Sequence, residues 1–348
     1  MSVRVLQAMA GAEFGGAEAF FMRLVVALHR AGVEQRVAIR KHPDRAKLLH
    51  AAGIEPLELS FGGRFDMATP RALKRAANEF NPDVVLTWMN RATQMAPKGN
   101  FVRAARLGGY YDLKYYQGCD HLIGNTEDIC EYLVEEGWPA DRVHYLPNFV
   151  SAENAAPIAR KDFYTPDTAP LILAMGRLHE NKAFDVLIEA VARVPDAYLW
   201  IAGEGPLRRE LEVQAETAGI KPRVRFLGWR DDTAALLATC DLFVCPSRHE
   251  PLGNVVLEAW AQAKPVVAAD SYGPGTLIEH MESGLLVPTD DAATLAKGIK
   301  AVLADNNLAR RLAKAGSAAY EADFTEASVV EKYREFFERV AAIGKGDI

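Results

Sequence analysis

The sequence predicts an α/β protein with two doubly wound parallel sheets, each in its own domain. Short apolar runs alternate with stretches of helical periodicity, which is the pattern of parallel strands joined by crossover helices. The alternation lapses once, where Pro, Asn, Ser and Ala gather before a second alternating series begins. With 348 residues, 49% of them apolar, the chain can bury two cores of ordinary size. We therefore expect domains at 1–150 and 170–324, joined by a linker at 151–169.

The first domain opens with a strand at 3–10 and a glycine-rich loop that leads into a helix. That helix is predicted by an apolar stripe at helical spacing, made of Ala17, Phe20, Phe21, Leu24, Val25 and Leu28. Helical stretches at 70–80 and 126–137 separate later strands, and Thr126 is placed to cap the second of these helices. The further predicted strands are 34–40, 83–88, 121–126 and 143–147.

The second domain repeats the alternation with apolar strands that read as buried on both faces. Its predicted strands begin at 171, 197, 224, 242, 265 and 284, each followed by a turn and most by a helix. After about residue 290 two helices follow, and then a last helix between 324 and 342. This last helix has one apolar stripe, made of Val329, Val330, Tyr333, Phe336 and Phe337.

Charge is unevenly distributed along a chain whose formal net charge is −6. Residues 36–114 contain 14 Lys and Arg against 7 Asp and Glu. This excess predicts either a basic face for an anionic acceptor or membrane surface, or ordinary solvated helix surface. The basic residues concerned include Arg71, Lys74, Arg75, Arg91, Arg103 and Arg106.

Cysteine spacing and hydropathy predict a cytoplasmic protein. Cys119, Cys130, Cys240 and Cys245 have no metal-finger or C-x-x-C spacing, which favours reduced thiols. The first ten residues are too short and too soon interrupted for a signal peptide, and no apolar run approaches about 18 residues. Any membrane contact is therefore expected to be peripheral.

The most informative stretch follows the strand that begins at 242. A turn carrying Glu250 leads into a helix, with Asn254 as the expected cap. Backbone amides at Leu252, Gly253 and Asn254 would sit at the positive end of this helix, which suits a phosphate. Glu258 lies one turn further along the face of Asn254. An acid before the helix and an acid within it could serve a sugar and a ribose.

Other candidate residues follow predicted strands, where open α/β sheets bind ligands. Arg177 and Lys182 follow the strand at 171 and could clamp a diphosphate. Gly203 and Gly205 make a strand-to-helix turn, which chain reversal alone would explain. Trp229 and Arg230 end the strand at 224, where Trp229 could simply pack.

The first domain offers weaker candidates. Gly15 and Gly16 precede the first helix and give amides that a phosphate or sugar could use. The segment 108–117 is rich in tyrosine, and aromatic faces stack on sugar rings. The residues of this segment that could line a site for a sugar acceptor are Tyr110, Tyr111, Asp112 and Lys114. Asp112 is equally well explained as the cap of a turn.

Two motifs give the chain a family resemblance. E-P-x-G-N-x-x-x-E at 250–258 and G-R-x-x-x-x-K-x-F-D at 176–185 resemble signatures of retaining GT-B glycosyltransferases, glycosyltransferase family 4 (group 1) in particular. Ala183 replaces the usual glycine of the second motif. The resemblance implies two Rossmann-like domains facing a central cleft, with a C-terminal helix at about 325–348 crossing back to the first domain. It covers nearly the whole chain and is most specific at 171–290.

The resemblance also implies roles for the candidate residues. Glu250, Arg177 and Lys182 would be catalytic, with Glu250 on the sugar side and the two cations on the leaving diphosphate. Many relatives have a histidine in the tyrosine-rich segment, which this sequence lacks, and Asp112 is the expected substitute. The remaining residues would bind the donor: Gly15, Gly16, Gly203, Gly205, Trp229, Arg230, Leu252, Gly253, Asn254 and Glu258.

The expected activity is metal-independent, retaining transfer of a sugar from a UDP- or GDP-linked donor to a glycan or glycolipid acceptor, in lipopolysaccharide or surface polysaccharide assembly. The nucleotide sugar is a substrate, and no cofactor, metal or nucleic acid is expected. The basic first domain could contact the inner face of an anionic membrane. Two alternatives remain open: a non-catalytic nucleotide-sugar binding protein, and a sugar-nucleotide epimerase or phosphorylase of the same fold.

Overall fold

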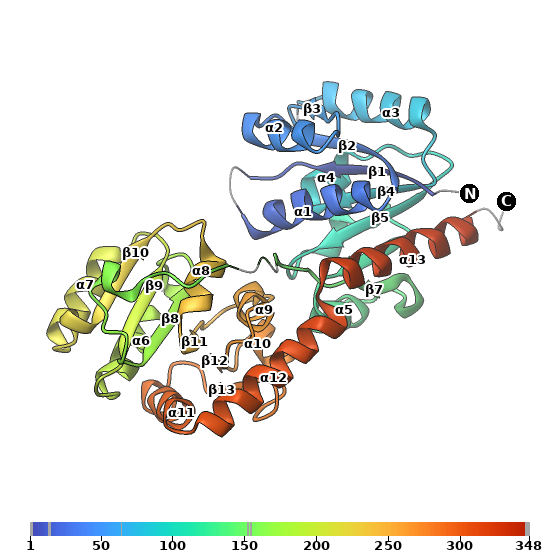
Figure 1. Cartoon of the computed structure of the whole chain (residues 1–348). Helices are drawn as coiled ribbons and strands as arrows, with labels where there is room; N and C mark the ends of the chain where they lie inside the picture. Colours follow the sequence, from blue (N-terminus) through green and yellow to red (C-terminus); the bar gives the residue numbers. More distant parts are fainter. Residues whose placement is uncertain (1–2, 13–14, 64, 152, 154, 345–348) are drawn as a thin grey trace. The chain divides into compact units, whose positions relative to one another are not determined.

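The computed structural model describes residues 3–12, 15–63, 65–151, 153 and 155–344. The chain divides into two compact units, the first made of residues 1–148 with 326–348 and the second of 149–325. Each unit is built on one parallel sheet flanked by helices (Figure 1). The predicted pair of doubly wound sheets is confirmed, and so is the return of the last helix to the first unit.

The first unit contains a seven-stranded sheet in the order β3-β2-β1-β4-β5-β6-β7, with every pair parallel. Its strands are β1 (Arg4–Met9), β2 (Glu34–Arg40), β3 (Leu57–Leu59), β4 (Val84–Trp88), β5 (Val102–Leu107), β6 (His121–Gly124) and β7 (Val143–Tyr145). Its helices are α1 (Gly16–Arg30), α2 (Pro43–Ala51), α3 (Ala68–Phe80), α4 (Met89–Met95), α5 (Glu127–Glu135) and α13 (Glu326–Gly344). Thr126 caps α5 as predicted, because its hydroxyl accepts a hydrogen bond from the amide of Ile129 at 3.1 Å.

The helix α13 completes the core of the first unit by packing against α1, β4 and β5. All five residues of its predicted apolar stripe are buried. Tyr333 also accepts a hydrogen bond from Nε of Arg106 at 2.9 Å. The Arg106 guanidinium lies 4.7 Å from the ring centroids of both Phe20 and Trp88 and is 2% exposed. The expectation that Arg106 belongs to a basic face is therefore wrong, because the side chain is part of this core.

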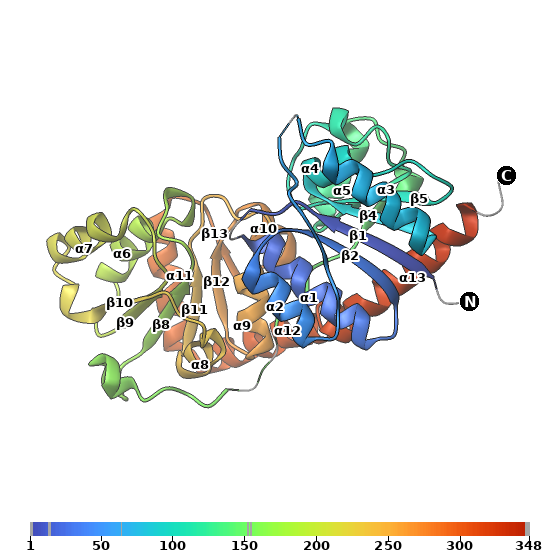
Figure 2. The ribbon, with the colours of Figure 1, turned by 90° about the horizontal axis from the view of Figure 1, so that it is seen from above.

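The second unit contains a six-stranded parallel sheet in the order β10-β9-β8-β11-β12-β13. Its strands are β8 (Leu171–Met175), β9 (Tyr198–Ala202), β10 (Val224–Gly228), β11 (Leu242–Cys245), β12 (Val266–Ala269) and β13 (Leu285–Val287). Its helices are α6 (Phe184–Ala192), α7 (Arg208–Thr217), α8 (Thr233–Thr239), α9 (Asn254–Ala261), α10 (Tyr272–Leu277), α11 (Ala292–Ala304) and α12 (Asn306–Asp323). One apolar cluster joins the sheet to α6, α7 and α11, and another joins its opposite face to α8, α9 and α12 (Figure 2).

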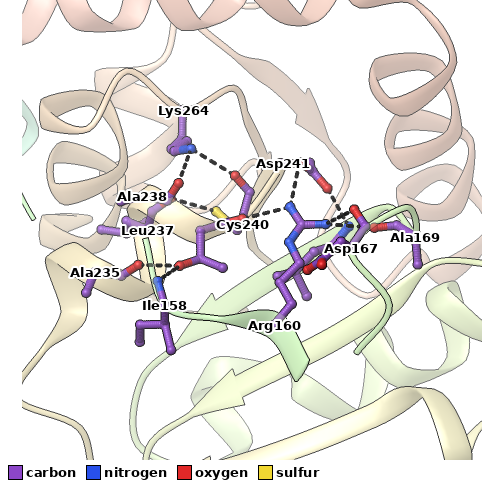
Figure 3. Close-up of polar contacts among 12 residues, drawn as sticks. Ile158, Arg160, Asp167, Ala169, Ala235, Leu237, Ala238, Cys240, Asp241 and Lys264 are labelled. Atoms are coloured by element: carbon purple, nitrogen blue, oxygen red, sulfur yellow. Dashed lines mark hydrogen bonds and ion pairs between the residues drawn. The ribbon is translucent and has the colours of Figure 1, made fainter. Parts of the chain in front are cut away.

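The segment 151–169, which we expected to be a linker, is attached to the second unit over much of its described length. The amide of Ile158 donates to the hydroxyl of Thr239 at 2.7 Å, and Arg160 forms an ion pair with Asp241 at 2.9 Å (Figure 3). The Thr165 hydroxyl accepts a 2.9 Å hydrogen bond from the indole of Trp200. These contacts hold the segment against the second unit.

Each sheet has one point at which the strand order reverses. In the first sheet this point lies between β1 and β4, and in the second sheet it lies between β8 and β11. The carboxyl ends of the strands at such a switch point form the usual ligand site of open α/β sheets.

Hydropathy gives no sign of a membrane-spanning helix in the described part of the chain. None of the helices found there combines enough length with enough apolar character to cross a bilayer.

Candidate active site

The switch point of the second sheet brings together two strand exits that carry predicted catalytic residues. Beyond β8 the chain passes Arg177 and makes a short 3₁₀ turn, Glu180–Lys182. Beyond β11 it forms the loop 246–253, which carries Glu250 and leads into α9. Because β8 and β11 are hydrogen-bonded neighbours, both exits open at the same edge of the sheet.

Lys182 and Glu250 are in direct contact at this edge. Nζ of Lys182 donates to Oε2 of Glu250, and the Glu250 residue is only 9% exposed. The Ser247 hydroxyl donates to the same carboxylate oxygen at 3.4 Å. A buried carboxylate needs such partners to remain charged. The two predicted residues thus form one unit of opposite charges.

Arg177 has a different environment at the same strand exit. Its side chain is exposed, and it makes no hydrogen bond or ion pair with the described residues of the chain. Gly176, which precedes it, has φ 149°, and the Lys182 side chain passes 3.4 Å from the position a Cβ would take there. Arg177 is therefore an exposed cation without an ion-pair partner among the described residues, and it follows the same strand as Lys182.

The helix α9 starts one residue earlier than predicted, at the residue that was expected to be its cap. Asn254 is its first residue, and Gly253 is the N-cap in the left-handed conformation, with φ 78°. The prediction that Asn254 caps the helix is therefore wrong, because a glycine adopts this turn without the strain of a Cβ. Leu252 is buried beside it, and Glu258 is half-buried on the first turns of the helix.

The glycines after β9 bring the backbones of two strand exits together. A Cβ on Gly203 would lie 1.9 Å from the carbonyl oxygen of Gly176, and one on Gly205 would lie 2.3 Å from that of Leu178. The amide of Gly203 also donates to the carbonyl of Gly228 at 2.8 Å. Close backbone packing accounts for both glycines, whether or not a donor also touches them.

Trp229 and Arg230 follow β10 at the edge of the second sheet. Trp229 is 81% exposed, so it does not pack into the core. Arg230 forms two hydrogen bonds with Asp232, at 2.7 and 2.5 Å, and lies over the ring of Phe163 at 5.5 Å. Arg230 is therefore held by its own turn, whereas the Trp229 side chain faces solvent.

The switch point of the first sheet contains Gly15 and Gly16 at the start of α1. Gly15 is the N-cap of this helix, and a Cβ there would meet a carboxylate oxygen of Glu18 at 2.2 Å. Glu18 is 7% exposed and accepts a hydrogen bond from the amide of Ala12 at 2.7 Å. The glycine thus leaves room for an acid that turns back onto its own loop, of which residues 13 and 14 lie outside the described chain.

The tyrosine-rich segment is organised by contacts within the first unit. Asp112 caps a 3₁₀ turn (Leu113–Tyr115) by accepting from the amide of Lys114 at 3.0 Å, and it forms an ion pair with the Lys114 ammonium at 2.5 Å. Hydrogen bonds from the Lys114 side chain and amide lower the pKa of the Asp112 carboxyl. Asp112 was expected either to contact the acceptor or to cap a turn, and the observed hydrogen bond supports the capping role.

The neighbouring tyrosines are tied to α5. The Tyr110 hydroxyl donates to Asp128, and its ring meets that of Tyr132 edge-on at 5.2 Å. The Tyr132 hydroxyl donates to the carbonyl of Tyr111 at 3.1 Å. Tyr110 remains 38% exposed, so one aromatic side chain of the segment is available to a ligand.

Sequence reasoning missed two residues of the loop 246–253. Ser247 hydrogen-bonds Glu250, and Arg248 forms ion pairs with Asp185 at 2.6 Å and with Asp290. The position of Ser247, three residues before a candidate acid, was the only signal for it. Nothing local signals the partners of Arg248, which come from the exits of β8 and β13.

Comparison with known proteins identifies the family. Residues 14–154 match the family described as "Glycosyltransferase Family 4", and residues 156–319 match "Glycosyl transferases group 1". The lipopolysaccharide core biosynthesis glycosyltransferase LpsE of Rhizobium meliloti is 39% identical over 325 residues, covering 92% of this chain and 94% of LpsE. The chain is a family 4 glycosyltransferase. The expected family and the expected enzyme class are thereby confirmed.

Solved structures confirm the GT-B fold of this glycosyltransferase. A glycosyltransferase from Rickettsia africae superposes with a TM-score of 0.87 at 18% identity, covering 97% of this chain and 98% of the other. HepE from Anabaena, crystallised with UDP, gives a TM-score of 0.85 at 20% identity over 97% of this chain and 100% of HepE. At such identities the likeness concerns the fold.

Proposed function

We propose that this glycosyltransferase transfers a sugar from a UDP- or GDP-linked donor to a glycan or glycolipid acceptor during assembly of the lipopolysaccharide core, with retention of the anomeric configuration. The naming of its relative LpsE supports the pathway. The UDP bound to HepE, a protein of the same fold, supports a nucleoside-diphosphate donor.

The observation that carries the proposal is the contact of Lys182 with Glu250, at a strand exit that also carries the exposed Arg177. Breaking the donor bond loads negative charge onto the diphosphate and positive charge onto the sugar. Arg177 and Lys182 stabilise the diphosphate, and Glu250 faces the sugar. A preorganised stabiliser of this kind is worth about 3–4 kcal/mol of the barrier.

The remaining donor contacts come from α9 and its N-terminus. The first amides of this helix, at Leu252–Asn254, bind the diphosphate with the positive end of the helix dipole behind them. Glu258 accepts hydrogen bonds from the ribose hydroxyls. The arriving diphosphate competes with Glu250 for Lys182, which releases the carboxylate toward the donor sugar.

The scheme requires no metal, because two side-chain cations and a helix N-terminus supply the positive charge. A chelator should therefore leave the transfer rate within about twofold, on a scale where losing one stabiliser costs 10²–10³-fold. The measurement is the initial rate in EDTA after dialysis. Full loss of activity, restored by a divalent cation, contradicts the metal-free scheme.

We also propose that the first unit holds the enzyme at the inner face of an anionic membrane. Phe65 and Met67, before α3, are 93% and 59% exposed, and Arg71 and Lys74 on α3 are exposed too. Apolar side chains beside basic ones suit an anionic lipid surface. Co-sedimentation with vesicles should occur with phosphatidylglycerol and fall for Phe65→Ser. Equal binding to neutral vesicles contradicts the electrostatic part.

The decisive experiment incubates the purified enzyme with a panel of UDP- and GDP-sugars and truncated lipopolysaccharide core acceptors. We expect one donor to release nucleoside diphosphate in an acceptor-dependent reaction. The ¹H NMR coupling constant of the new anomeric proton gives the configuration of the product, and comparison with the donor should then show retention. Release of nucleoside diphosphate with free sugar and no acceptor product points to a hydrolase, and conversion of the donor into another nucleotide sugar points to an epimerase. Binding without turnover points to a non-catalytic binding protein.

A further inference from the structure

Three successive residues of the loop 246–253, which carries Glu250, are hydrogen-bonded to residues outside the loop. Nη1 of Arg248 donates to the carbonyl of Glu180 at 2.8 Å, and the amide of His249 donates to the carbonyl of Asn181 at 3.2 Å. The carbonyl of Glu250 accepts from the amide of Gly273 at 2.7 Å. Two of these hydrogen bonds reach the segment after β8 and the third reaches the segment after β12, so the loop position is set by both segments and not by the loop alone.

Arg248 provides the strongest of these contacts. Its guanidinium forms a two-pronged pair with Asp185, from Nη1 to Oδ1 at 2.9 Å and from Nη2 to Oδ2 at 2.6 Å. Nε donates to Asp290, which follows β13. Two-pronged guanidinium–carboxylate pairs fix orientation as well as distance. One side chain therefore joins the loop after β11 to the first turn of α6 and to the turn after β13.

The partners of Arg248 flank the residue that contacts Glu250. Glu180 and Asp185 lie two residues before and three residues after Lys182, and Arg248 itself lies two residues before Glu250. Arg248 therefore belongs to the loop that carries Glu250 and contacts residues on both sides of Lys182 in the sequence. Neither Arg248 nor Asp185 has a contact that would make it part of the Lys182–Glu250 pair itself.

We propose that Arg248, through Asp185 and Asp290, is a positioning residue that fixes the spacing of Lys182 and Glu250 across the two strand exits. This inference rests on the proposed function of that pair. Exposed ion pairs add little to stability, and the side chains of Arg248, Asp185 and Asp290 are 31%, 43% and 55% exposed. A displacement of about 1 Å at a catalytic group, in contrast, costs about 10²-fold in rate. Loss of the ion pairs of Arg248 should therefore reduce the transfer rate more than it reduces the stability of the fold.

The test compares Arg248→Gln, Arg248→Lys and Asp185→Asn with a matched surface variant. Arg193→Gln removes an exposed ion pair with Glu189 in the same unit, and it should leave all parameters unchanged. We expect Arg248→Gln and Asp185→Asn to lower kcat about 10²-fold, with donor KM within about threefold and little change in Tm. Arg248→Lys keeps the charge but not the fork, so it should recover only part of the rate. A kcat within twofold of the wild type for Arg248→Gln overturns the proposal.

A second measurement separates positioning from a merely structural role. In a Glu250→Ala background, Arg248→Gln should lower the residual rate by less than twofold, because the pair that it positions is already lost. A further 10²-fold loss in that background means that Arg248 acts independently of Glu250, which overturns the proposal.

A crystal structure of Arg248→Gln tests the inference without any activity. The Lys182–Glu250 contact should be broken or lengthened by more than 1 Å while both sheets superpose on the wild type. An unchanged contact overturns the positioning role even if the enzyme transfers no sugar from any donor. Failure of the wild type to turn over, with the contact broken in the variant, overturns the proposed function alone.

Discussion

The switch points of the two sheets both hold a buried acid near a cation, but the two acids have different partners. Glu18, in the first unit, accepts from the backbone of its own loop, whose Ala12 carbonyl accepts in turn from Arg45. Glu250, in the second unit, accepts from Lys182 on a neighbouring strand exit. A backbone amide cannot leave its carboxylate without remaking the loop, whereas a lysine side chain can turn to a phosphate. Glu18 and Glu250 are thus buried to a similar degree, but only Glu250 has a side-chain partner that can turn away from it.

The cation of the first switch point supports this distinction. Burial lowers the pKa of the Arg45 guanidinium, and the charge of Glu18 opposes that effect. Arg45 is 8% exposed, so no ligand can approach it as one could approach Arg177. The buried charges of the first switch point thus hold a loop in place, whereas the second switch point leaves the Arg177 cation exposed to solvent.

The largest expected effect tests the acid of the second switch point. Glu250→Gln should lower transfer by about 10²–10³-fold, because it removes a charge needed only in the transition state. The dissociation constant for nucleoside diphosphate should stay within a few-fold. Steady-state rates and isothermal titration give the two numbers. A variant that loses nucleotide affinity as strongly as rate would place Glu250 on the nucleotide instead.

The next effect tests how tightly the strand exits of the second unit are packed. Gly203→Ala should destabilise the fold by about 2–4 kcal/mol, since its Cβ would strike the Gly176 carbonyl and φ is 146°. Gly219→Ala is the matched control, with φ 71° but open space around the added atom, and should cost about 1 kcal/mol. Denaturant unfolding measures both. Equal costs would mean that the exits do not depend on close backbone contact.

A smaller effect tests the acid of the first switch point. Glu18→Ala should destabilise the protein by about 1–3 kcal/mol, because the Ala12 amide loses its acceptor and Arg45 loses a nearby carboxylate. At saturating donor and acceptor, kcat should stay within about threefold. Thermal unfolding and initial rates give the comparison. A rate loss as large as that of Glu250→Gln would break the contrast between the two switch points.

A last effect concerns pH and a histidine of the first unit. Burial, the charge of His121 and that of Arg339 lower the pKa of His144 to about 4, whereas an unfolded histidine titrates near 6.5. The unfolded chain therefore binds a proton first, so stability falls as pH drops from about 6.5 to 4. Tm measured across this window should fall less steeply for His144→Gln. Identical slopes would contradict the role of His144.

The strands of the second unit and the start of α9 were predictable because their signals are local. Uninterrupted apolar runs mark β8, β9 and β11, and the motif at 250–258 places an acid before a helix. The one-residue error at Asn254 arose because a left-handed glycine replaced the expected side-chain cap. Contacts between strand exits, such as that of Arg248 with Asp185, join residues far apart in sequence and leave no local pattern.

The strand β5 was missed for a related reason. Its sequence carries Arg103 and Arg106 among short apolar residues, which reads as a polar surface segment. Arg106 is buried because the rings of Phe20 and Trp88 and the Tyr333 hydroxyl surround it. Those groups come from α1, β4 and α13, so the burial of this arginine could not be deduced from its neighbours.

The return of α13 to the first unit has a consequence for synthesis on the ribosome. Residues 1–148 emerge first but lack Tyr333 and the rest of that helix, which fill the core between α1 and β5. The unit 149–325 is contiguous in sequence, whereas the first unit needs residues from both sides of it. A chain truncated before residue 326 would therefore leave exposed the apolar residues of α1, β4 and β5 that α13 covers.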